Sequence, residues 1–171
     1  EKMQAEAAID ESTSQETATP EFEIREDGVL LKYNGDGGVV TVPDGVRFIC
    51  DYAFCEDDYA NTPRDIITEL ILPEGLTSLE DDPFMHFQNL QKVTFPSTLK
   101  TITGFNGCTQ LKEVVIPEGV EEISWNAFSG CTSLETVTLP STIKKIGSYA
   151  FDDCVNLKTI VLPDTLDEVY A

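Results

Sequence analysis

The sequence predicts a repeat solenoid, a stack of short coils that follows a small β cap and an acidic N-terminal segment. Prolines recur at intervals of 21–23 residues after a first interval of 30. Two apolar residues precede each proline with one residue between them, the period-two pattern of a strand that the proline ends. A second apolar pair follows each proline. The prolines are Pro43, Pro73, Pro96, Pro117, Pro140 and Pro163.

Residues 1–20 are predicted to be a disordered acidic linker rich in Ser and Thr. Their only large apolar residues are Met3 and Ile9, too few to offset the entropy lost on ordering. Two interpretations remain open: an ordinary disordered end, or a spacer that holds the folded part away from a membrane or cell wall.

Residues 21–43 are predicted to be an N-terminal β-hairpin cap. Apolar residues alternate from Phe22 to Tyr33, and Asp27-Gly28 and Asn34-Gly35 supply the positive φ angles that tight turns require. We expect two or three short antiparallel strands that end in residues 39–43. Such an atypical unit covers the first apolar coil of a repeat array.

Residues 44–171 are predicted to form about five coils and a terminal strand. A leucine precedes most strands by three places, and an aromatic segment after the second apolar pair closes on Cys108, Cys131 or Cys154. We expect a short turn of helix or 3₁₀ helix there. The apolar strand pairs are Val40/Val42, Leu70/Leu72, Val93/Phe95, Val114/Ile116, Val137/Leu139 and Ile160/Leu162.

Two irregularities break the repeat. Seven extra residues between Cys55 and Ile67 should form a loop, which is either tolerated drift or a binding loop. The segment Thr103-Gly104-Phe105 is two residues short, so the turn of the third coil should be pinched.

The repeat unit resembles that of the BspA-like, or Treponema-type, leucine-rich repeat family. Its pattern is L-x-x-V-x-L-P-x-x-(I/L)-x-x-I-G-x-x-A-F-x-x-C, which Leu134–Cys154 matches best and Leu111–Cys131 next. Departures occur at Cys50 and Pro83. The resemblance implies a right-handed leucine-rich-repeat β/α (3₁₀) coil with a parallel sheet on its concave face. It also implies a secreted or surface-attached bacterial protein that acts in adhesion or protein recognition, from a family without a shared catalytic motif.

The formal charge of −20, from 31 acidic and 11 basic residues, argues against nucleic acid and anionic lipid as partners. Solubility is the simpler explanation, and attraction of basic partners or divalent cations is the other. No run of about 18 apolar residues exists, so we expect no transmembrane segment.

Neither a catalytic nor a metal site is predicted, and we expect no cofactor. Cys108, Cys131 and Cys154 recur at the repeat period and should be stacked buried thiols, whereas pairing of Cys50 with Cys55 stays open. His86 is the single histidine, without a nucleophile motif beside it. The acidic runs could hold calcium or be solvated loops, and none has the spacing of a calcium-binding loop. They are Glu56-Asp57-Asp58, Glu80-Asp81-Asp82 and Asp152-Asp153.

The concave strands expose a flat stripe of β-branched residues with few charges, which strand propensity or a binding face would explain. The candidate partner-binding residues on it are Thr41, Ile71, Thr94, Val115, Thr138 and Val161, with Glu69, Lys92 and Glu113 beside them.

The functional prediction is therefore a non-enzymatic extracellular or cell-surface recognition module. It would bind a protein or glycan through the concave face or the insert loop. The alternative is a structural spacer or assembly element that stacks through its C-terminal coil near Leu162. A hydrolase is a remote third hypothesis, which would require a deep pocket around His86.

Overall fold

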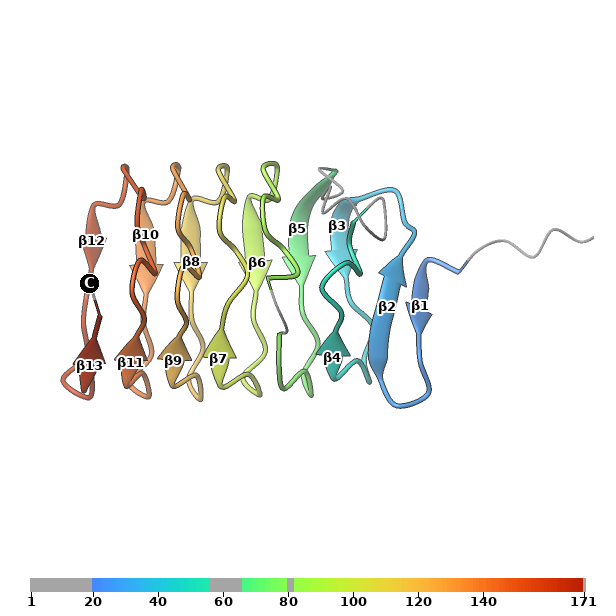
Figure 1. The fold of residues 1–171 in the computed structure, drawn as a ribbon, viewed down its shortest axis with the longest axis horizontal. Helices are drawn as coiled ribbons and strands as arrows, with labels where there is room; N and C mark the ends of the chain where they lie inside the picture. Colours follow the sequence, from blue (N-terminus) through green and yellow to red (C-terminus); the bar gives the residue numbers. More distant parts are fainter. Residues whose placement is uncertain (1–19, 56–65, 80–81, 171) are drawn as a thin grey trace, which may run out of the picture.

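The computed structural model describes residues 20–55, 66–79 and 82–170, which form an elongated stack of coils (Figure 1). Within these ranges every regular element is a strand. The predicted linker, apart from Pro20, and most of the insert after Cys55 lie outside the described residues. The described part contains no helix long and apolar enough to span a membrane.

One row of parallel strands comes from the residues before each proline, as the alternating pattern predicts. Where two of these strands pair, the buried member of one lies beside its counterpart in the next coil, for example Val114 beside Val137. The strands pair in the orders β3-β5-β6 and β8-β10-β12. They are β3 (Gly38–Thr41), β5 (Ile67–Ile71), β6 (Lys92–Thr94), β8 (Glu113–Val115), β10 (Thr136–Thr138) and β12 (Thr159–Ile160). We call the outward side of this row the ladder face.

A second row of short strands comes from the apolar pair after each proline. Four of them pair in parallel in the order β7-β9-β11-β13. They are β7 (Thr101–Ile102), β9 (Glu122–Ile123), β11 (Lys145–Ile146) and β13 (Glu168–Val169). Every coil from the third onward therefore has two strands, one on each side of the core (Figure 1).

The N-terminal cap has the lower of the two numbers of antiparallel strands predicted. β1 (Phe22–Ile24) and β2 (Val29–Tyr33) pair antiparallel, with a register shift between Glu23 and Ile24. β2 also pairs in parallel with β4 (Phe48–Ile49), and β3, at the end of the predicted cap, pairs in parallel with β5. Gly37 and Gly38, with φ of 85° and 71°, turn the chain from the hairpin into the first coil.

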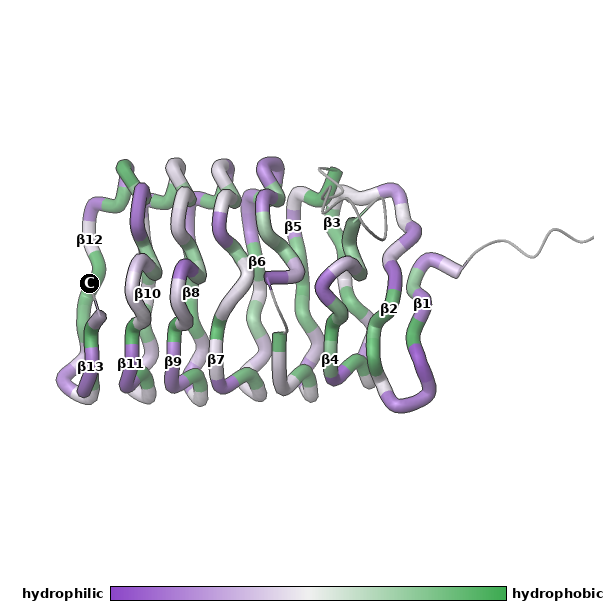
Figure 2. Tube along the Cα trace, in the orientation of Figure 1, coloured by the Kyte–Doolittle hydropathy of each residue, from purple (hydrophilic) through white to green (hydrophobic). Residues whose placement is uncertain are grey.

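Apolar side chains from both rows fill the interior, and hydropathy alternates along each coil (Figure 2). An aromatic column runs through this core along the stack, with neighbouring ring centroids 5.0–5.7 Å apart. Its rings are those of Tyr33, Phe54, Phe84, Phe105, Phe128 and Phe151. The repeated phenylalanine thus ties successive coils together.

The segments around these phenylalanines are turns in the described residues, so their predicted helical character is not confirmed. Hydrogen bonds between residues three apart, such as Cys131 N to Phe128 O at 3.2 Å, close each turn. Two positions in each turn from the second coil onward adopt left-handed backbone. The first is Asp82, Gly104, Asn126 or Tyr149, and the second is His86, Gly107, Gly130 or Asp153.

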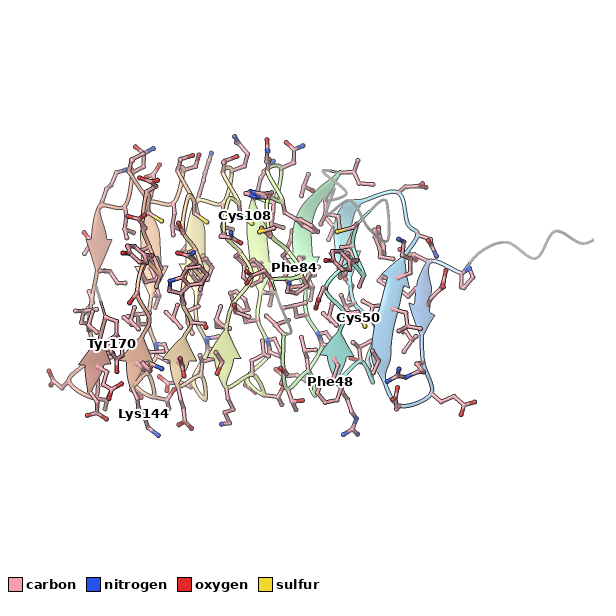
Figure 3. The ribbon with its side chains drawn as sticks, in the orientation of Figure 1. Phe48, Cys50, Phe84, Cys108, Lys144 and Tyr170 are labelled. Carbon is pink, nitrogen blue, oxygen red and sulfur yellow. The ribbon has the colours of Figure 1, made fainter. Side chains whose placement is uncertain are left out.

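None of the five cysteines forms a disulfide, so Cys50 and Cys55 are not joined by one. The three periodic cysteines are buried, as predicted, and each donates from Sγ to a backbone carbonyl of the preceding coil. Cys131 Sγ lies 3.2 Å from Phe105 O. Figure 3 shows Cys108 and Phe84 within the coil stack. Burial raises the pKa of the Cys131 thiol to about 12 and that of Cys154 to about 11.

From Pro73 to Pro140 the turns after the prolines are alternately Glu-Gly and Ser-Thr, and hydrogen bonds join each Glu-Gly turn to the Ser-Thr turn of the next coil. Glu118 accepts hydrogen bonds from the backbone N and the hydroxyl of Ser141 at 2.9 and 3.0 Å. In return, Gly119 N donates to Thr142 Oγ1 at 3.0 Å. Two coils earlier the same contacts join Glu74-Gly75 to Ser97-Thr98.

Candidate functional site

The ladder face aligns the predicted binding residues in two columns. In β6, β8 and β10 the middle residue is buried and its two neighbours are exposed. Strand register therefore places Ile71 beside Thr94, and Val115 beside Thr138. Val161 follows the end of β12 and is 74% exposed.

Charged side chains pair across neighbouring coils on this face. Lys92 Nζ lies 2.6 Å from Glu69 Oε1. Glu135 and Lys158 directly precede β10 and β12. Lys158 donates a hydrogen bond to Glu135, which lowers the pKa of the Glu135 carboxyl. Such exposed pairs contribute little to stability, so they set the charge pattern of the face more than its stability.

The ladder face is interrupted between β6 and β8. Parallel pairing joins β3 to β5, β5 to β6, β8 to β10 and β10 to β12, but β6 and β8 belong to different sheets. Two strand edges, which carry N–H and C=O groups directed out of their sheets, therefore face each other in the middle of the row.

A surface groove of about 440 Å³ lies along this interruption. Its apolar lining includes Val93, Phe95 and Val115, and Val115 is 52% exposed. Polar and charged side chains surround these residues. They are Gln91, Lys92, Thr94, Lys112 and Glu113. The groove thus combines an apolar lining, two lysines, a glutamate and the edges of two strands.

Two departures from the repeat coincide with the interruption. Phe95 occupies a position that Leu or Ile fills in the neighbouring coils, and its ring packs edge-on against Phe105 at 5.2 Å. The shortened segment at Gly104 lies in the turn that leads into β8. The break thus has a larger side chain directly after β6 on one side and a shorter path to β8 on the other.

The groove collects four of the nine predicted residues: Lys92, Thr94, Glu113 and Val115. The others lie on the same strand row outside its lining; they are Thr41, Ile71, Glu69, Thr138 and Val161. Sequence reasoning missed the contributions of five lining residues, which are Gln91, Val93, Phe95, Lys112 and Pro117. Phe95 carried the one usable signal, an aromatic residue in an aliphatic position.

A match to a protein-family model identifies the family to which the repeats belong. A model described as "BspA type Leucine rich repeat region" matches in six copies over residues 38–103 and 58–171. The chain belongs to the BspA-type leucine-rich repeat family. No curated protein sequence matches it.

Solved structures give BspA-type repeats the same fold. The chain is similar to a leucine rich cell surface protein from Faecalibacterium prausnitzii, with 31% identity, TM-score 0.67 and coverage of 80% of this chain and 36% of that one. It is also similar to the Treponema pallidum leucine-rich repeat protein, with 29% identity, TM-score 0.67 and coverage of 80% and 65%. A leucine-rich repeat protein from Eubacterium ventriosum, 22% identical with coverage of 87% and 48%, shares the fold at TM-score 0.65. The chain thus spans about one third to two thirds of the length of these proteins.

The described residues were compared with the two kinds of site that the acidic runs and His86 left open, a metal site and a site built around the histidine. No group of three or more His, Cys, Asp and Glu side chains there could hold a metal ion. His86 is exposed on its turn with φ of 61° and is not among the residues that line the groove. Asp152 and Asp153 are exposed, whereas Glu56-Asp57-Asp58 and Glu80-Asp81 lie outside the described residues.

Proposed function

We propose that this chain is a non-enzymatic recognition module that binds an extended polypeptide segment of a protein partner in the groove between β6 and β8. The observation that supports this proposal is the interrupted strand pairing together with the groove that lies along it. Strand edges offer backbone hydrogen bonds to an extended chain, and adjacent apolar side chains select alternate residues of that chain.

The charge of the protein favours a basic or neutral partner. A net charge of −20 raises the encounter rate with cationic segments and repels anionic ones. Glu113 at the groove offers a local acceptor for a lysine or arginine. The same groove also carries two positive charges, those of Lys92 and Lys112. Lys92 is paired with Glu69.

A location at the bacterial cell surface fits the proposed role. One similar protein is described as a cell surface protein, and stacked repeats with an open strand row are a common scaffold for protein recognition.

The test uses a displayed library of linear peptides, selected on the whole protein. We expect enriched peptides that combine β-branched or aromatic residues with lysine or arginine. Val115→Arg should weaken their binding about 10-fold or more, because it places a long charged side chain in the apolar part of the groove. Thr138→Arg is the matched control, since it adds the same side chain one strand farther along the row.

Peptides that bind both variants as well as the wild type would remove the groove from consideration. Failure to enrich any peptide would contradict the proposal that the module recognises extended polypeptides. Circular dichroism on both variants separates a binding effect from loss of the fold.

A further inference from the structure

A second hollow, of about 740 Å³, lies away from the ladder face beside β7. Among the described residues, β7 is the last strand of the β7-β9-β11-β13 sheet. The segment 76–79, which follows Pro73 in the coil before it, forms no strand. The volume lies within the range of about 300–1,000 Å³ that is usual for small-ligand sites.

Trp125 lines this hollow and is the only tryptophan of the chain. The side chain is 60% exposed although indole is among the most costly groups to leave in water. The backbone around it is well fixed. Asn126 N donates to Ser148 O at 3.1 Å, and the absence of a side chain at Gly147 lets the next coil approach, because a Cβ there would lie 2.7 Å from Trp125 N.

Besides Leu79 and Met85, the rest of the lining is polar and partly pre-arranged. Thr103 Oγ1 donates to Asp82 Oδ1 at 3.1 Å. No described residue donates to the other carboxylate oxygen of Asp82. Three further hydroxyls line the hollow, those of Ser78, Thr101 and Ser124. Gly104 allows this arrangement, since a Cβ there would meet Pro83 Cδ at 2.9 Å and Asp82 Cα at 3.0 Å.

We propose that this hollow is a binding site for a neutral saccharide. A sugar ring has one face of C–H groups, which packs on the negatively polarised face of an indole. Its rim of hydroxyls both donates and accepts hydrogen bonds. The carboxylate of Asp82 accepts strongly from such hydroxyls, and the Ser and Thr side chains serve in both directions.

The charge and composition of the site select among other ligands. The net charge of −20 disfavours sialylated, sulfated or uronic-acid sugars. A cationic ligand is held best between several aromatic rings, whereas Trp125 is the only aromatic residue in this lining. The four hydroxyls match a polyhydroxylated neutral ligand.

The single tryptophan makes a direct experiment possible. The whole protein is titrated with the neutral oligosaccharides cellotetraose, maltotetraose, mannotetraose and chitotetraose, and tryptophan emission is recorded. At least one of them should give a saturable shift or change in intensity at micromolar to millimolar concentration, because stacking on the indole removes it from water.

Asp82→Asn is the decisive variant, because Asn adopts the left-handed backbone of residue 82, with φ of 55°, as readily as Asp. It should weaken binding about 10-fold, the ratio expected when a hydrogen bond to a charged group becomes a neutral one. Trp125→Ala, measured by calorimetry, should abolish binding. Tyr149→Ala removes an exposed aromatic of the next coil that is not part of the lining and should leave affinity unchanged.

Absence of a saturable change with all four oligosaccharides would overturn the proposal. Equal binding by Asp82→Asn and the wild type would also overturn it, as would preference for sialylated or sulfated tetrasaccharides. Val115→Arg alters the peptide groove but not the lining of the hollow, so it should leave saccharide binding intact. The two proposals can therefore be contradicted separately.

Discussion

Gly104 and Gly45 share a left-handed backbone but have very different surroundings. Their φ angles are 85° and 92°. A Cβ on Gly104 would lie 2.9 Å from Pro83 Cδ, whereas a Cβ on Gly45 would meet no atom within 4 Å. The two positions therefore separate the cost of the backbone conformation from the cost of a close approach between coils.

We predict that Gly45→Ala lowers the free energy of unfolding by about 1 kcal/mol, the cost of a left-handed alanine. Gly104→Ala should lower it by about 3 kcal/mol, because the second and third coils must also move apart. Urea denaturation of the two variants measures the difference. Equal losses would show that coils two and three are not held in contact at residue 104.

The buried thiol of Cys131 should make stability depend on alkaline pH. Its pKa is raised to about 12 in the folded state. A folded-state pKa above the unfolded one means that the stabilising contribution is complete below the unfolded pKa and is lost as pH rises toward 12. The loss amounts to about 1.4 kcal/mol per pH unit.

Cys131→Ala should therefore be less stable than the wild type at neutral pH, by about 1–2 kcal/mol for the lost sulfur, but should lose less stability in alkali. Unfolding curves measured from about pH 8 to about pH 10.5 test this difference in slope. Parallel pH profiles for the two proteins would mean that Cys131 ionises as readily when folded as when unfolded.

At the level of strands, the sequence predicted register more reliably than pairing. Residues 23 positions apart, such as Thr136 and Thr159, do lie side by side. The sequence did not predict the break between β6 and β8, although it coincides with Phe95 and the short turn at Gly104. Periodicity shows which residues face outward, but it does not show whether adjacent strands are close enough to bond.

The break should be visible in hydrogen exchange. Strand β10 pairs on both sides, whereas β6 and β8 each have one edge without a strand partner in the described sheets. Amides in β6 and β8 should exchange faster than those in β10, because protection requires a stable backbone hydrogen bond. Mass spectrometry of peptic fragments measures the rates, and equal protection of the three strands would contradict an open groove.

The hollow at Trp125 was harder to foresee than the ladder face. The repeat predicts the shortened turn at Gly104, but the hollow also requires Asp82 from the second coil and Trp125 from the fourth. A site formed by residues of three coils leaves no periodic pattern in the sequence. The available hint was a lone tryptophan close to the irregular coil, at a position that Ser148 occupies in the next repeat.

On the scale of the whole molecule, the repeat determines the fold, and both proposed sites lie where the repeat is irregular. The core column from Tyr33 to Phe151 continues unbroken past the third coil. Only the two strand rows are disturbed there, one at the groove and one beside β7. The molecule therefore keeps a continuous core while it opens its surface on both sides of the same coil.

From Pro73 to Pro140 the turns after the prolines alternate between Glu-Gly and Ser-Thr, so their chemistry repeats every two coils although the fold repeats every coil. Excision of one coil would bring Glu74 next to Glu118, two carboxylates with no hydroxyl between them. Excision of two adjacent coils would instead bring Glu74 next to Ser141 and restore the contact seen between Glu118 and Ser141. Chains of this kind can therefore be lengthened or shortened most safely by duplicating or deleting coils in pairs.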